Sequence, residues 1–150
     1  MALGLVTGLA GQSRNEASVF KLELTIKDGT EAAAKAGRRY TLLMNNGEKS
    51  RFRLGNKVPV TGANGGTTYV DVGVDIDATV WEQNGTFSLR AEIEVSSPNK
   101  QESMQVPVIG QMRVTVSTTL VLGKTTQVAA VDDPVTQRKF EVDALVTKVN

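Results

Sequence analysis

Hydrophobic and polar residues alternate strictly from Thr68 to Ser96, the most regular stretch of the chain. The even positions from Val70 to Val80 are apolar, and most of the odd positions between them are polar. After Asn84-Gly85 the alternation resumes, with an apolar row from Phe87 to Val95. A period of two puts the apolar side chains on one face of a β-strand. The pattern therefore predicts two long strands, each with one buried face.

Asn84-Gly85 predicts a two-residue hairpin turn between these strands. Both residue types tolerate the positive φ angles of a type I′ turn, whose twist matches that of the flanking strands. Gln83 is then expected opposite Thr86. This turn fixes the register of the whole hairpin.

The register places like charges opposite each other on the polar face. Asp77 is expected to face Glu92, and Asp75 to face Glu94. Facing like charges destabilise a sheet. Water, salt or cations from another strand or another chain must therefore offset them.

The segment from Lys49 to Leu54 offers such cations, because Lys49, Arg51 and Arg53 share one face of a predicted strand. Two interpretations stay open. The face is either a solvated mixed-charge surface, since exposed ion pairs contribute little, or a seam of arginines and carboxylates within or between subunits. The residues of this candidate assembly seam are Arg51, Arg53, Asp75, Asp77, Glu92 and Glu94.

Further alternating segments and turn signals predict an all-β fold. We expect an antiparallel two-layer sandwich or barrel-like sheet of about eight strands, with the Ala-rich segment 30–36 as one short helical connector. The other expected strands are 19–27, 38–45, 48–60, 112–122, 125–131 and 138–149. The predicted core includes Val72, Val74, Ile76, Leu89, Ile93, Val114, Val116, Leu120, Phe140 and Val142.

Residues 40–131 carry an ordered set of motifs that resembles the C-terminal β domain of secretins, the outer-membrane ring channels of secretion and pilus systems. The motifs are Gly55-Asn56-Lys57-Val58-Pro59, Tyr69-Val70-Asp71-Val72-Gly73-Val74, Glu94-Val95-Ser96, Arg113-Val114-Thr115-Val116 and Gly123-Lys124-Thr125. The resemblance implies a secretin-like strand topology. It covers neither the upstream ring domains of that family nor its Pro/Gly-rich signature, since Gln127 to Pro134 leads straight to the last strand.

Composition excludes several function classes. The 150 residues contain no His and no Cys, which removes thiolate catalysis and the commonest metal ligands. The net charge of +1 and 5% aromatic residues give neither the charge nor the stacking surface of a nucleic-acid-binding protein. No apolar run is long enough for a transmembrane helix. We predict no catalytic residues, no cofactor, no metal site and no enzymatic activity.

Residues 1–17 are apolar and small at the start but lack the basic residues that begin an export signal. Two interpretations stay open for them, the remnant of a truncated export signal and a flexible leader. Residues 18–150 are expected to form a single β domain. Placement outside the cytoplasm is expected, whether periplasmic, associated with the outer membrane or secreted.

Two functions fit this sequence. The first is a non-catalytic envelope domain for structural assembly, associating with itself into a ring or filament or with an envelope protein partner. The alternative is a soluble extracytoplasmic binding module for a glycan or peptide. Its candidate stacking residues are Trp81 and Tyr69, on the polar face of the first predicted strand.

Overall fold

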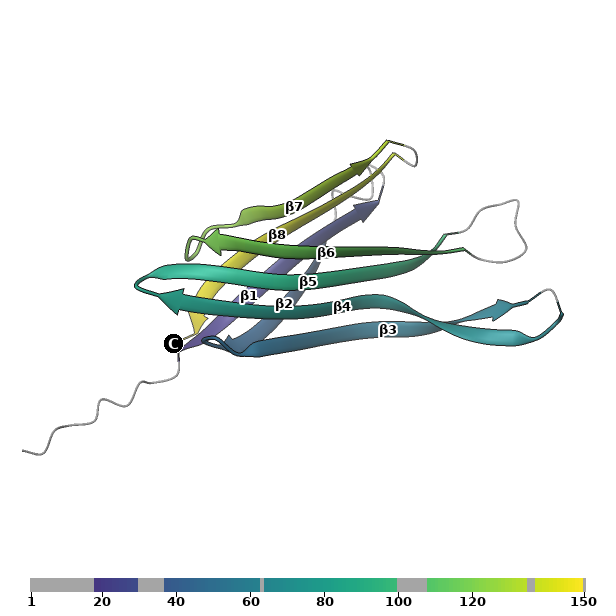
Figure 1. The fold of residues 1–150 in the computed structure, drawn as a ribbon, viewed down its shortest axis with the longest axis horizontal. Helices are drawn as coiled ribbons and strands as arrows, with labels where there is room; N and C mark the ends of the chain where they lie inside the picture. Colours follow the sequence, from purple (N-terminus) through teal and green to yellow (C-terminus); the bar gives the residue numbers. More distant parts are fainter. Residues whose placement is uncertain (1–17, 30–36, 63, 100–107, 135–136, 150) are drawn as a thin grey trace, which may run out of the picture.

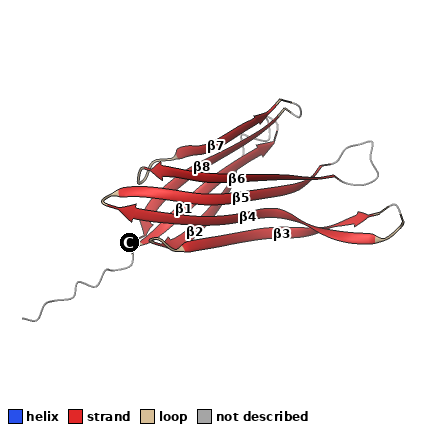
Figure 2. Cartoon of the chain, in the orientation of Figure 1, coloured by secondary structure: helices blue, strands red, loops and turns tan. Residues whose placement is uncertain are grey.

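The structure is a computed structural model that describes residues 18–29, 37–62, 64–99, 108–134 and 137–149. These residues form eight β-strands and no helix (Figure 2). None of the described residues belongs to a helix that could cross a membrane. The expected connector at 30–36 and the leader at 1–17 lie outside the described residues.

The strands form two antiparallel four-stranded sheets packed face to face (Figure 1), which confirms the predicted fold class. The first sheet has the order β2 (Arg38–Asn45), β1 (Val19–Gly29), β8 (Arg138–Val149) and β7 (Thr126–Asp133). The second sheet has the order β3 (Lys49–Thr61), β4 (Thr67–Gln83), β5 (Thr86–Asn99) and β6 (Val108–Leu120).

The β4–β5 hairpin has the predicted turn. Asn84 and Gly85 have φ angles of 53° and 78°, as a type I′ turn requires, and Gln83 pairs with Thr86. The register continues along the strands as predicted, with the two acidic pairs on the polar face opposite each other.

The inner faces of both sheets make one hydrophobic core. Nine of the ten predicted core residues are buried. The exception is Val114 of the edge strand β6, which packs against the core but is only half-buried. Phe20 of the first sheet meets Phe87 of the second edge to face, with ring centroids 5.5 Å apart.

The turn at Asn46-Gly47 carries the chain from one sheet to the other. The Gly47 N–H donates to the Val80 carbonyl at 2.8 Å, and the Asn46 N–H donates to the Ser18 carbonyl at 3.2 Å. β2 and β3 therefore lie over each other as edge strands on one side of the sandwich, and β6 and β7 do so on the other.

The second sheet extends beyond the first at the end where β3 joins β4 (Figure 1). The two strands twist across each other on the way to this end, and along them Gly73 of β4 pairs with Gly55 of β3. Leu54 and Tyr69 are 58% and 64% exposed on this hairpin. We call residues 54–73 the β3–β4 arm.

Candidate functional site

The outer face of the second sheet carries the candidate seam. Arg53, Asp75, Glu94 and Arg113 lie in one row across β3, β4, β5 and β6. The Arg53 Nε donates to Asp75 at 2.9 Å, and the Arg113 Nε donates to Glu94 at 3.0 Å. The two facing carboxylates thus each have an arginine on the outer side, in a row of charges that runs plus, minus, minus, plus.

A second row also places cations beside two facing carboxylates. Arg51 makes a bidentate contact with Asp77, with donor–acceptor distances of 2.6 and 2.9 Å, and Lys49 approaches the same carboxylate at 2.7 Å. Glu92 faces Asp77 across the hairpin and is reached diagonally by Arg113, at 3.5 Å. The cations needed to offset the acidic pairs are therefore supplied within the chain, by the two edge strands.

These contacts hold the carboxylates in their ionised form. Hydrogen bonds from Arg51 and then Lys49 lower the pKa of Asp77 far below its ordinary value, and those from Arg113 and then Gln111 lower the pKa of Glu94. The same pairing raises the pKa of Arg51 and Arg113. A general acid or base needs a pKa near the working pH, so Asp77 and Glu94 suit charge pairing better than proton transfer.

Arg113 is the member of this site that the sequence interpretation missed. The alternation predicts that Arg113 is on the outer face of its strand, because Met112 and Val114 on either side are apolar. Its pairing partners could not be predicted, because β5 and β6 are joined by a long connection with no turn motif that fixes the register.

The structure does not bring the two candidate stacking residues together. Trp81 is 40% exposed and packs over the β2–β3 turn, where its Cδ1 lies 3.3 Å from the point that a Cβ on Gly47 would occupy. Tyr69 lies on the arm, twelve residues earlier in the same strand, which is about 40 Å at ~3.3 Å per strand residue. They cannot contact one small ligand at the same time.

Charge reversal at Arg51 and Arg53 should destabilise the protein measurably, and more at low than at high salt. The double variant Arg51→Glu and Arg53→Glu puts two more acids beside Asp75 and Asp77, and salt screens exposed charges over about 10 Å at 0.1 M. We expect the urea midpoint to fall at 20 mM salt and to recover in large part at 1 M salt.

The matched control for this variant is Lys57→Glu. Lys57 is on the same strand and pairs with Asp71 at 3.2 Å, with both side chains at least 70% exposed. It should change the urea midpoint little, as exposed pairs generally do. Equal salt-dependent losses in both variants would show that the seam has no special role in stability.

Solved structures with the same fold are secretin β domains. A match to the InvG secretin domain β-barrel from the Salmonella SPI-1 injectisome has a TM-score of 0.55 at 9% identity, and covers 89% of this chain and 62% of that chain. The chain has the secretin β fold. A second match is to a chain of the Klebsiella pneumoniae type II secretion system outer membrane complex, which contains PulD, PulS and the PulC HR domain. Its TM-score is 0.55 at 13% identity, and the match covers 89% of this chain and 38% of that chain.

The type II secretin GspD of enteropathogenic Escherichia coli also matches, with a TM-score of 0.52 at 11% identity, covering 89% of this chain and 66% of that one. This chain spans between 38% and 66% of the three secretin-containing chains. No family model and no curated protein matches the sequence. The resemblance inferred from the strand motifs is thus confirmed at the level of the fold.

Proposed function

We propose that this chain is a non-catalytic structural domain of the bacterial cell envelope, and that it associates head to tail with copies of itself into a ring or a filament. The observation that carries the proposal is the secretin β fold, shared over 89% of the chain with InvG of an injectisome and with GspD of a type II secretion system. The proposed place is outside the cytoplasm, and the other candidate partner is an envelope protein.

The strand order suits such an assembly. Each sheet has four strands, all antiparallel, so its two edge strands run in opposite directions. Placing β6 of one copy beside β3 of the next continues the second sheet with antiparallel pairing, and placing β7 beside β2 does the same for the first. The edge strands β2 and β3 lie together on one side of the sandwich, and β6 and β7 lie together on the other. A single head-to-tail contact can therefore extend both sheets. Exposed edges are templates for this pairing.

The charges on the two sides favour head-to-tail contacts over contacts between like sides. β2 and β3 contain six basic residues and no acidic one. β6 and β7 contain one basic residue, Arg113, and two acidic ones, Asp132 and Asp133. Complementary potentials steer association and suppress wrong pairings. In this proposal the seam of Arg51 and Arg53 with Asp75 and Asp77 holds the receiving edge strand β3 in place.

Lysines on the β6 edge should block assembly. Ser117 and Thr119 are exposed on the outer face of β6, and edge lysines are a common natural device against edge pairing. The variant Ser117→Lys and Thr119→Lys would also meet the basic residues on β3 of the next copy. We expect sedimentation velocity and negative-stain imaging to show rings or filaments for the wild type and monomers for this variant.

The control variant is Thr86→Lys and Ser88→Lys, which adds the same charge on the same face of the neighbouring, central strand β5. It should still assemble. A wild-type protein that stays monomeric up to millimolar concentration would contradict the assembly proposal and favour the soluble binding module instead.

A further inference from the structure

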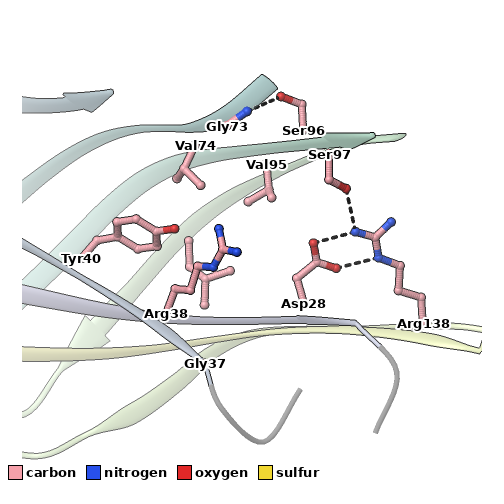
Figure 3. A pocket seen from close by; sticks show the side chains of 11 residues that line it. Asp28, Gly37, Arg38, Tyr40, Gly73, Val74, Val95, Ser96, Ser97 and Arg138 are labelled. Carbon is pink, nitrogen blue, oxygen red and sulfur yellow. Dashed lines mark hydrogen bonds and ion pairs between the residues drawn. The ribbon is translucent and has the colours of Figure 1, made fainter. Parts of the chain in front are cut away.

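A cavity of about 470 Å³ opens between the two sheets, at the end where β1, β2 and β8 face β4 and β5 (Figure 3). Ile26, Val74 and Val95 form apolar walls. This volume lies in the range of small-molecule pockets, about 300–1,000 Å³. The cavity is separate from the charged outer face, since it lies on the inner side of the sheets.

Arg38 is an unusual residue for this position. The inward-facing positions of β2 are every second residue, and Tyr40, Leu42 and Met44 among them are buried. The same row begins at Arg38, which lines the cavity. Figure 3 shows its side chain rising from β2 towards Val95. Within the described part of the chain its guanidinium has neither a hydrogen bond nor an ion pair. Arg38 is exposed and its charge is solvated, so its guanidinium is available to donate to an anion that enters the cavity.

Tyr40 supplies a second donor in the same cavity. Its side chain is only 7% exposed, with its ring against Phe52 at a centroid distance of 5.5 Å. Its hydroxyl has no hydrogen-bond partner among the described residues. Every fully buried polar side-chain atom in that part of the chain does have a partner, so the Tyr40 hydroxyl is not fully buried and opens into the cavity. In Figure 3 it points towards the Arg38 guanidinium.

The other charged groups of the cavity neutralise each other. Arg138 makes a bidentate contact with Asp28, with both distances at 2.7 Å, and also donates to the Ser97 hydroxyl at 3.1 Å. The lining therefore keeps one uncompensated positive charge, that of Arg38. An apolar cavity with a free cation and a free hydroxyl is complementary to an anion that carries an apolar body.

We propose that this cavity binds a small organic carboxylate with an alkyl body. The carboxylate accepts hydrogen bonds from Arg38 and Tyr40, and the alkyl chain lies against Ile26, Val74 and Val95. Charge-assisted hydrogen bonds from arginine to a carboxylate are the strongest of their kind in proteins, so the headgroup fixes the orientation. Arg38 and Tyr40 belong to the edge strand β2, but they lie in its inward row, and the proposal does not require the assembly proposed above.

Isothermal titration calorimetry of the full chain with sodium octanoate tests the site, with 1-octanol as the uncharged probe. We expect saturable one-to-one binding of octanoate and a weaker response to 1-octanol. Arg38→Gln should reduce the octanoate affinity about tenfold or more, and Tyr40→Phe about threefold or more, because each removes one donor to the carboxylate. Amide shifts of Gly37 and Val95 on titration should locate the ligand in the cavity.

Arg39→Gln is the matched control, because Arg39 is the next residue of the strand, is 70% exposed and points to the opposite face, near Glu23. It should bind octanoate as the wild type does. Thermal melts establish that each variant is folded, and Tyr40→Phe keeps the ring that packs on Phe52. Absence of saturable binding, or an equal loss in Arg38→Gln and Arg39→Gln, would overturn the proposal. Aggregation of Arg38→Gln with unchanged octanoate binding would also overturn it, and would assign Arg38 to protecting the β2 edge.

Discussion

Replacement of Gly73 by alanine should destabilise the protein by about 3 kcal/mol or more, because a steric clash adds to a backbone strain of ~1–3 kcal/mol. A Cβ at this position would lie 2.0 Å from the Leu54 carbonyl oxygen and 2.6 Å from the Gly55 Cα. The φ of +151° is also one that residues with side chains rarely adopt. Both obstacles are backbone atoms of the paired strand, so no side-chain rotation relieves the clash.

Urea unfolding followed by circular dichroism measures this effect, and Gly85→Ala is the control. Gly85 also has a positive φ, of 78°, but no neighbouring atom lies within 4 Å of a Cβ built there. It should cost only about 1 kcal/mol, the usual penalty for alanine in a left-handed conformation. If Gly73→Ala cost no more than Gly85→Ala, the close approach of β3 and β4 would not depend on this glycine.

Local sequence was enough to predict the β4–β5 hairpin. The alternation assigns each side chain to a face, and a two-residue turn at Asn84-Gly85 leaves one register. Asp77 opposite Glu92 follows from these two facts alone, and the structure has this pair. Electrostatics also predicted that something must offset the facing acids, with water, salt and cations as the open alternatives. In the structure Arg51 contacts Asp77 and Arg53 contacts Asp75.

Long-range pairing was not predictable in the same way. The turn at Asn46-Gly47 has the same sequence signal whether it closes a hairpin or passes between sheets, and only packing against Val80 and Ser18 decides. The partners of Arg113 depend on the pairing of β5 with β6. The cavity beside Arg38 depends on how the two sheets lie over each other, for which the strand pattern carries no signal.

Replacement of Ile76 by aspartate should leave the protein largely unfolded at 25 °C. Ile76 is fully buried in the central strand β4, between Phe52 of β3 and Ile93 of β5. The described part of the chain has no buried polar or charged side chain that could pair with the new carboxylate. An unpaired buried charge together with lost packing costs on the order of 4–5 kcal/mol or more, against a total stability of typically ~5–15 kcal/mol.

Thr79→Asp is the matched control, because it adds the same residue to the same strand on the polar face. Thr79 lies opposite Lys49 of β3 and Arg90 of β5, so the new carboxylate has cations on both sides, and the stability should change by no more than about 0.5 kcal/mol. Urea midpoints and the dispersion of amide proton signals separate the two variants. The two substitutions lie on opposite faces of the same strand. Comparable losses of stability would mean that the faces of β4 are not divided into core and surface. The assignment of the polar face and its seam would then be wrong as well.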